Sequence, residues 1–94
     1  MIPITPLGEA LKADAPEAYD SRGFVRLRRG EVALALADYD QALSLSPELA
    51  TARYGRGLAR LRLGRENEGR SDLAAARAAE PDVAEDFARY GLRP

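Results

Sequence analysis

The chain has 94 residues and a formal net charge of -1, and 46% of its residues are hydrophobic and 31% charged. This composition is typical of one small folded domain, and the lack of a basic surplus argues against binding of nucleic acid by the domain as a whole. Because the sequence contains no cysteine and no histidine, it excludes disulfides, thiolate nucleophiles, imidazole bases and the usual zinc ligand sets, and we expect no enzyme activity, no cofactor and no metal site.

The first fourteen residues predict a short helix at residues 6–13. Thr5 can cap it with its hydroxyl, and Pro6 suits the first helical turn. Leu7 and Leu11 then lie on one face of the helix. We expect this helix to cover the exposed end of the structure that follows it.

The next helix is predicted at residues 16–29. Tyr19, Gly23 and Leu27 follow one another at four-residue steps, which places them on one helical face. Gly30 then supplies the positive φ that a helix end and a tight turn favour. The pattern therefore predicts a helix followed immediately by a turn.

A second helix is predicted from Glu31 onward. The Glu31 carboxylate there meets the positive end of the helix dipole. Ser46 precedes Pro47 and resists helical geometry, which ends the helix. Small and large apolar residues alternate on its predicted buried face: Ala35, Tyr39, Ala42, Leu43 and Leu45.

A similar pattern of residues recurs 34 positions later, which indicates an internal repeat. The stretch from Arg22 to Gly30 recurs from Arg56 to Gly64, and Asp38 and Pro47 recur at the same offset. The repeat predicts a second pair of helices at residues 50–63 and 66–79, with a turn at Gly64. A further lone helix is expected near the C-terminus.

A period of 34 residues built from two helices resembles the tetratricopeptide repeat family. The resemblance covers about residues 15–93 and is strong in the first unit and weaker in the second. The signature positions of the first unit fall on Tyr19, Gly23, Ala35, Tyr39, Ala42 and Pro47. Those of the second fall on Arg53, Gly57, Gly69, Leu73, Ala76 and Pro81, and Phe87 and Gly91 fall on the aromatic and glycine positions of a third.

The resemblance implies an all-α fold, an α-α superhelix of about two and a half helical hairpins with N-terminal and C-terminal capping helices. Its expected parts are an N-terminal segment at residues 1–14, units at 15–49 and 50–83, and a capping helix at 84–94. We expect a structural role for the signature residues Tyr19, Gly23, Ala35, Tyr39, Ala42, Pro47, Gly57, Leu73, Ala76, Pro81 and Phe87.

Two arginines in each unit depart from the family pattern, at positions where leucine and tyrosine are usual. Arg22 and Arg26 recur as Arg56 and Arg60. An isolated buried charge costs several kcal/mol or more, so each arginine needs an anion nearby. Asp38 and Asp72 recur at the same offset on the second helices. We predict that Asp38 pairs with Arg22 or Arg26, and Asp72 with Arg56 or Arg60.

Charge is sorted by helix, and this admits two interpretations. Residues 22–29 carry four arginines and no acid, whereas residues 31–48 carry four acids and no base. In the first interpretation, opposite charges complement each other within every hairpin. In the second, the first helices line a concave face, as the family resemblance implies, and form a groove with a positive bias.

The resemblance places a partner-binding groove on the first helix of each unit. Its concave positions fall on Glu17, Asp20, Phe24, Leu27 and Arg28, and on Thr51, Tyr54, Leu58, Leu61 and Arg62. We expect Phe24, Arg28, Tyr54, Leu58 and Arg62 to contact a protein or peptide with hydrophobic and acidic side chains.

The carboxylate clamp of one branch of the family is not expected here, since its positions hold Asp20, Phe24 and Gly55 instead of lysine and asparagine.

The main alternative is homo-oligomerisation, in which another copy fills the groove, because two and a half repeats bury little apolar surface. Nucleic-acid binding through the arginine-rich helices predicts a steep salt dependence instead. No apolar run approaches the roughly 20 residues of a membrane-spanning helix, so we expect no membrane partner. Thirteen arginines against one lysine suggest a bacterial source. We expect a cytoplasmic location, or a periplasmic one if a leader was removed.

Overall fold

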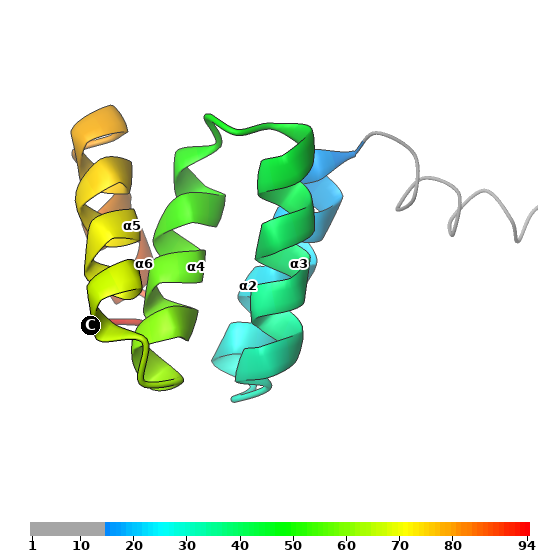
Figure 1. Ribbon diagram of the computed structural model, residues 1–94, viewed down its shortest axis with the longest axis horizontal. Coiled ribbons are helices and arrows are strands. Elements are labelled where there is room, and N and C mark those ends of the chain that lie inside the picture. Colours follow the sequence, from blue (N-terminus) through cyan, green and yellow to red (C-terminus); the bar gives the residue numbers. More distant parts are fainter. Residues whose placement is uncertain (1–14) are drawn as a thin grey trace, which may run out of the picture.

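The computed structural model describes residues 15–94 and forms a stack of antiparallel helices (Figure 1). The first hairpin pairs α2 (Pro16–Arg28) with α3 (Val32–Leu45). The second hairpin pairs α4 (Ala50–Arg62) with α5 (Glu66–Ala79), and α6 (Val83–Ala88) follows it. No strand occurs in residues 15–94, which confirms the all-α expectation. The helix expected at residues 6–13 lies outside the described residues.

The two hairpins repeat with the period seen in the sequence. Adding 34 to the bounds of α2 gives the bounds of α4, and adding 34 to those of α3 gives those of α5. The predicted helices therefore agree with the observed ones to within one residue at each end. The same local rules end the helices of both units, since Gly30 and Gly64 follow the first helices and Pro47 and Pro81 follow the second helices.

Gly30 and Gly64 end the first helix of each hairpin in the same way. Their φ angles are +83° and +84°, values that L side chains rarely adopt. The backbone N–H of Glu31 donates to the carbonyl of Arg26 at 2.9 Å, and that of Arg65 donates to the carbonyl of Arg60 at 2.8 Å. This i to i-5 bond is the Schellman cap, which satisfies a free carbonyl at the helix end.

The last helix is shorter than expected. A capping helix was predicted over residues 84–94, with Gly91 at the position of a packed helical glycine, but α6 spans Val83–Ala88. Gly91 instead has φ +78°, and the N–H of Leu92 donates to the carbonyl of Phe87 at 3.1 Å. A third glycine cap therefore ends α6 early, and Gly91 lies in a turn instead of against another helix.

The α4 helix lies at the centre of the stack, between α3 and α5, and α6 packs against both α4 and α5 (Figure 1). The first helices of successive hairpins, α2 and α4, also contact each other, and α6 continues that row. The second helices α3 and α5 lie on the other side. Consequently α2, α4 and α6 surround one face of the molecule.

Glycine lets the helices approach closely at three crossings, α2–α3, α3–α4 and α4–α5. A Cβ at Gly55 would overlap the ring of Tyr39, and one at Gly23 would lie 3.1 Å from the same ring. At the α4–α5 crossing, a Cβ at Gly57 would lie 2.8 Å from the carbonyl oxygen of Gly69. Gly69 in the middle of α5 is therefore explained by this contact, which offsets part of its low helix propensity.

The core follows the repeat positions. The buried signature residues are Ala35, Tyr39, Ala42, Leu73 and Ala76, together with Gly23, Gly57 and Phe87. Tyr19 is half-buried, whereas Pro47 lies exposed between the two hairpins and Pro81 lies exposed between α5 and α6. Burial raises the pKa of Tyr39 far above its ordinary value, and the charges of Asp20 and Asp38 add to this effect.

Candidate functional site

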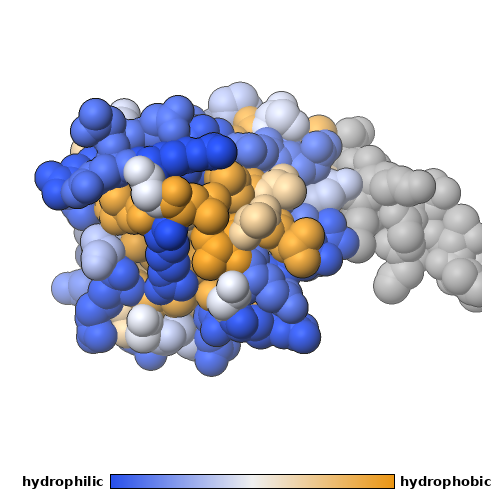
Figure 2. All heavy atoms as spheres, turned by 60° about the horizontal axis from the view of Figure 1, so that its bottom comes forward, coloured by the Kyte–Doolittle hydropathy of each residue, from blue (hydrophilic) through white to orange (hydrophobic). Residues whose placement is uncertain are grey.

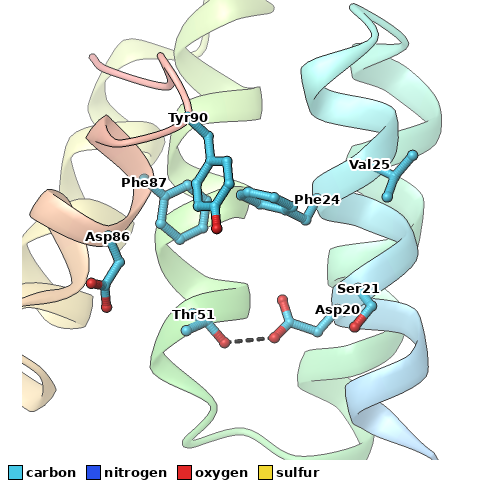
Figure 3. A pocket seen from close by; sticks show the side chains of 8 residues that line it. All are labelled: Asp20, Ser21, Phe24, Val25, Thr51, Asp86, Phe87 and Tyr90. Atoms are coloured by element: carbon cyan, nitrogen blue, oxygen red, sulfur yellow. Dashed lines mark hydrogen bonds between the residues drawn. The ribbon is translucent and has the colours of Figure 1, made fainter.

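A hollow of about 350 Å³ opens between α2, α4 and α6 (Figure 3). The α2 helix contributes four residues to it, α4 contributes one, and α6 with the turn after it contributes three. Its lining residues are Asp20, Ser21, Phe24, Val25, Thr51, Asp86, Phe87 and Tyr90. The hollow thus lies on the face surrounded by the first helices of the hairpins.

Aromatic rings form one end of the hollow. The ring of Phe24 meets Phe87 edge-on at a centroid distance of 5.5 Å and Tyr90 at 5.1 Å. Phe87 in turn packs on Tyr54 of α4 at 4.9 Å. These contacts join α6 to α2 across α4, and edge-to-face pairs of this kind contribute about 0.5–1.5 kcal/mol beyond their burial.

Carboxylates form the other end. The hydroxyl of Thr51 donates to Oδ2 of Asp20 at 2.6 Å, and this bond links α4 to α2 (Figure 3). Burial raises the pKa of Asp20, the Thr51 bond lowers it in part, and the charge of Glu17 raises it. Asp86 lines the hollow from α6, with its carboxylate directed away from Asp20 (Figure 3), and forms an exposed ion pair with Arg89 at 3.4 Å. Among residues 15–94, no basic side chain lines the hollow.

The structure does not bring the five predicted partner-binding residues together. Phe24 lines the hollow, and Arg28 lies at its edge, with its guanidinium 5.8 Å from the Phe24 ring centroid and 5.1 Å from that of Tyr90. Tyr54 and Leu58 are each only 1% exposed. Arg62 lies apart from the hollow, with Nη1 3.5 Å from the carbonyl oxygen of Leu27.

Burial of Tyr54 and Leu58 has a physical cause. Phe87 of α6 packs on Tyr54, and the chain after α6 reaches Leu58, which lines a small pocket with Arg93 and Pro94. Their side chains therefore belong to the core and offer no surface to a partner. The α6 segment accordingly occupies space that the family resemblance assigned to an open groove.

Five lining residues lie outside the concave positions expected from the sequence: Ser21, Val25, Asp86, Phe87 and Tyr90. Phe87 was assigned only a structural role. The spacing of Phe87 and Tyr90 could have indicated that they act together, because residues three apart in a helix share a face. Asp86 carried no such signal, since its place at the hollow depends on how α6 packs against α4.

The arginines of the first helices bind aspartates of the second helices. In the first hairpin, Asp38 accepts hydrogen bonds from Nε and Nη2 of Arg22 at 3.0 and 2.8 Å and from Nη1 of Arg26 at 3.0 Å. These bonds confirm the predicted internal link of the first unit. The bond to Asp38 raises the pKa of Arg22, so the arginine stays charged.

The second hairpin repeats the arrangement. Asp72 accepts hydrogen bonds from Nε and Nη2 of Arg56 at 2.9 and 3.1 Å and from Nη1 of Arg60 at 2.9 Å. Arg53 adds an ion pair to Asp72 at 3.8 Å, and Arg56 also bonds Asp40 at 3.1 Å. Four arginines of the first helices, Arg22, Arg26, Arg56 and Arg60, are thus paired with an aspartate of their own hairpin, which supports charge complementarity, whereas Arg28 keeps its positive charge at the edge of the hollow.

None of the described helices, α2 to α6, is both long and apolar enough to span a membrane. Within residues 15–94, no group of three or more acidic side chains is placed to hold a metal ion.

A family model described as TPR repeat matches residues 23–64. The matched stretch contains the end of α2, all of α3 and all of α4, with the caps at Gly30 and Gly64. No curated protein and no solved structure matches the chain significantly.

Proposed function

Since the chain belongs to the tetratricopeptide repeat family, we propose that it is a non-catalytic module that binds a segment of another protein in the hollow between α2, α4 and α6. Repeats of this family generally mediate contacts between proteins. The observation that carries the proposal is the position of the hollow, which the first helices of successive hairpins surround.

The chemistry of the hollow supports binding of a side chain. An aromatic wall gives an anchoring residue apolar contact, and hydrogen-bonding groups at the other end can fix its orientation. Phe24 is half-buried and held by two ring contacts, so it presents a surface with little freedom left to lose. A volume of about 350 Å³ suits one or two side chains of an extended segment.

Selection from a random peptide display library tests this proposal without knowledge of the natural partner. Peptides enriched on the parent protein should bind Tyr90→Ala at least about five-fold more weakly, because the variant removes one wall of the hollow. Leu34→Ala is the matched control. Leu34 exposes 50% of its surface and Tyr90 54%, but Leu34 lies on α3, away from the hollow.

Two results of this selection count against the hollow. One is a set of peptides that bind the parent and Tyr90→Ala equally well. The other is a loss of binding that is as large in Leu34→Ala. Circular dichroism melting of both variants establishes that each remains folded, which their exposed positions favour.

A second candidate function, assembly with another copy, draws support from the surface at the end that carries the turns at Gly30 and Gly64. Figure 2 shows apolar atoms gathered there, with hydrophilic atoms around them. Leu63, next to the second turn, exposes 42% of its surface. Sedimentation at several concentrations decides this point, because a persistent monomer at high concentration contradicts assembly.

A further inference from the structure

We propose that the occupant of the hollow is a basic side chain, the lysine of a partner segment with apolar neighbours, whose ammonium group binds the free carboxylate oxygen of Asp20, while Asp86 adds negative charge from the α6 side. This inference rests on the proposed function, because it names the partner chemistry of the same site. It differs from the acidic and hydrophobic partner expected from the sequence.

The charge of Asp20 is the first step. Asp38 and Asp72, the two buried aspartates of residues 15–94, each bind two or more arginines. Asp20 is half-buried, and within the same residues it binds the neutral hydroxyl of Thr51. A partly desolvated carboxylate without a cation is unfavourable, and its raised pKa reflects this. A cation from a partner would supply what the arginines supply elsewhere.

The geometry of Asp20 leaves room for such a cation. Thr51 occupies Oδ2, and the other carboxylate oxygen points into the hollow toward the aromatic end (Figure 3). That oxygen accepts no hydrogen bond from the described residues. An ammonium group entering the hollow therefore meets a free acceptor in a partly dehydrated setting, where a charge-assisted bond is strong.

Asp86 adds a second negative charge from the facing helix. Its ion pair with Arg89 is 3.4 Å long, and both side chains are more than half exposed. Such surface pairs contribute little and exchange readily with water. Arg89 therefore neutralises Asp86 only in part, and the remaining negative charge attracts an ammonium group that enters the hollow.

The aromatic end sets the orientation of the occupant. Arg28 already holds a positive charge over the rings of Phe24 and Tyr90, and it disfavours a second cation there. A lysine places its aliphatic stem along the rings and its ammonium at the carboxylate end, as long basic side chains commonly do. The hollow thus matches the two ends of a lysine side chain in chemistry and in order.

Nuclear magnetic resonance titration with three synthetic peptides tests the inference. The peptides share the sequence Ac-Ser-Gly-Leu-X-Leu-Gly-Ser-NH2, with lysine, norleucine or glutamate at X. Norleucine keeps the apolar stem and removes the ammonium. We expect the lysine peptide to bind about ten-fold more tightly than the norleucine peptide, the contribution of one charge-assisted hydrogen bond, and the glutamate peptide to bind most weakly. Amide shifts should concentrate at Asp20, Phe24, Thr51 and Asp86.

Variants then assign the effect to the two carboxylates. Asp20→Asn keeps the acceptor for Thr51 and removes the charge, and it should reduce the lysine peptide's affinity about ten-fold, to the level of the norleucine peptide. Asp86→Asn should reduce it about three-fold. Glu85→Gln is the matched control, because it removes one charge from the neighbouring exposed residue, which does not line the hollow. Its affinity should equal that of the parent.

Three outcomes overturn the inference. Equal affinity of the lysine and norleucine peptides overturns the preference for a basic side chain. If both peptides shift the amide signals of residues in the hollow, the proposed function still stands. An unchanged affinity in Asp20→Asn also overturns the inference. Absence of amide shifts with every peptide overturns the inference too. The proposed function is tested separately, by the display selection and its Tyr90→Ala variant.

Discussion

Asp38 on α3 receives both ends of the Arg22 guanidinium fork from α2, through bonds of 3.0 and 2.8 Å. The carboxylate is 3% exposed, whereas the Arg22 side chain keeps 40% of its surface in water. The acid is therefore the buried partner and the base the accessible one. This arrangement binds the two helices of the hairpin to each other and recurs between Arg56 and Asp72.

Asp38→Ala should lower the free energy of unfolding by about 2 kcal/mol, as measured by urea denaturation. The substitution removes three hydrogen bonds at once. Removal of one partner from a fully buried pair costs about 3–5 kcal/mol. The loss should be smaller here, because water reaches the arginines that remain.

Asp40→Ala is the control for this prediction. Its side chain is 52% exposed and bonds Arg56, which keeps Asp72 as a partner. We expect a loss below about 0.5 kcal/mol, the usual size for an exposed pair. Equal stabilities of Asp38→Ala and the parent would remove the structural role assigned to the arginine and aspartate pairs.

Gly55→Ala should destabilise the fold by about 3 kcal/mol, because the new methyl group overlaps the buried Tyr39 ring. Thermal and urea denaturation measure the loss. Gly64→Ala provides the comparison, since Gly64 has φ +84° and nothing within 4 Å of the added atom. That variant should lose only about 1 kcal/mol, which is backbone strain without a clash.

A double-mutant cycle separates the clash from other effects of Gly55→Ala. The second unit has Leu73 where the first has Tyr39, so Tyr39→Leu is the natural smaller residue at this position. In the Tyr39→Leu background, Gly55→Ala should cost at least about 1 kcal/mol less than in the parent. Strict additivity of the two changes would show that the ring does not cause the loss.

Much of the fold could be predicted from the sequence, because short-range rules determine it. Gly30 and Gly64 end helices where only positive φ is favoured, and the 34-residue offset transfers every boundary from one hairpin to the next. The pairing of Asp38 with arginines also followed from the sequence. A charge that recurs at a fixed depth in each unit requires a partner that recurs with it.

The candidate site was harder to predict, because it depends on packing between distant parts of the chain. Phe24 contacts Phe87 and Tyr90 only because α6 lies beside α4, and the same contact buries Tyr54. Gly91 occupies a repeat position but forms a cap, so the repeat could not indicate where α6 ends. The acidic charge of the hollow has the same origin.

Phe87→Ala should lower the free energy of unfolding by about 3 kcal/mol, because the ring is 4% exposed and packs on both Tyr54 and Phe24. The loss should be concentrated at the end of the stack. Hydrogen exchange should therefore accelerate at the amides of α6 more than at those of α3.

Tyr90→Ala serves as the comparison for α6, since its ring is 54% exposed. It should cost about 1 kcal/mol or less, mostly its edge-to-face contact with Phe24. Uniform acceleration of exchange across the described helices, α2 to α6, of Phe87→Ala would mean that α6 does not undock separately.

Asp20→Asn should raise the stability of the unliganded protein at pH 7, and the gain should shrink as the pH falls. Burial raises the pKa of the Asp20 carboxyl above its ordinary value of 3.8, and the charge of Glu17 adds to this, so the charged form disfavours folding. That penalty is fully present above the folded pKa and disappears as the pH falls through the folded pKa toward 3.8. Urea denaturation of parent and variant over a pH series measures the difference, with Asp86 unchanged in both proteins.

Thr51→Val sharpens this prediction, because it removes the one bond that lowers the pKa of Asp20. The penalty of the charged carboxylate should then grow, and the pH range over which stability recovers should move upward. Asparagine at position 20 still accepts the Thr51 bond, so the two substitutions act on charge and hydrogen bonding separately. A stability difference between Asp20→Asn and the parent that does not change with pH would contradict the assigned cause, since only a titrating carboxylate can produce the slope.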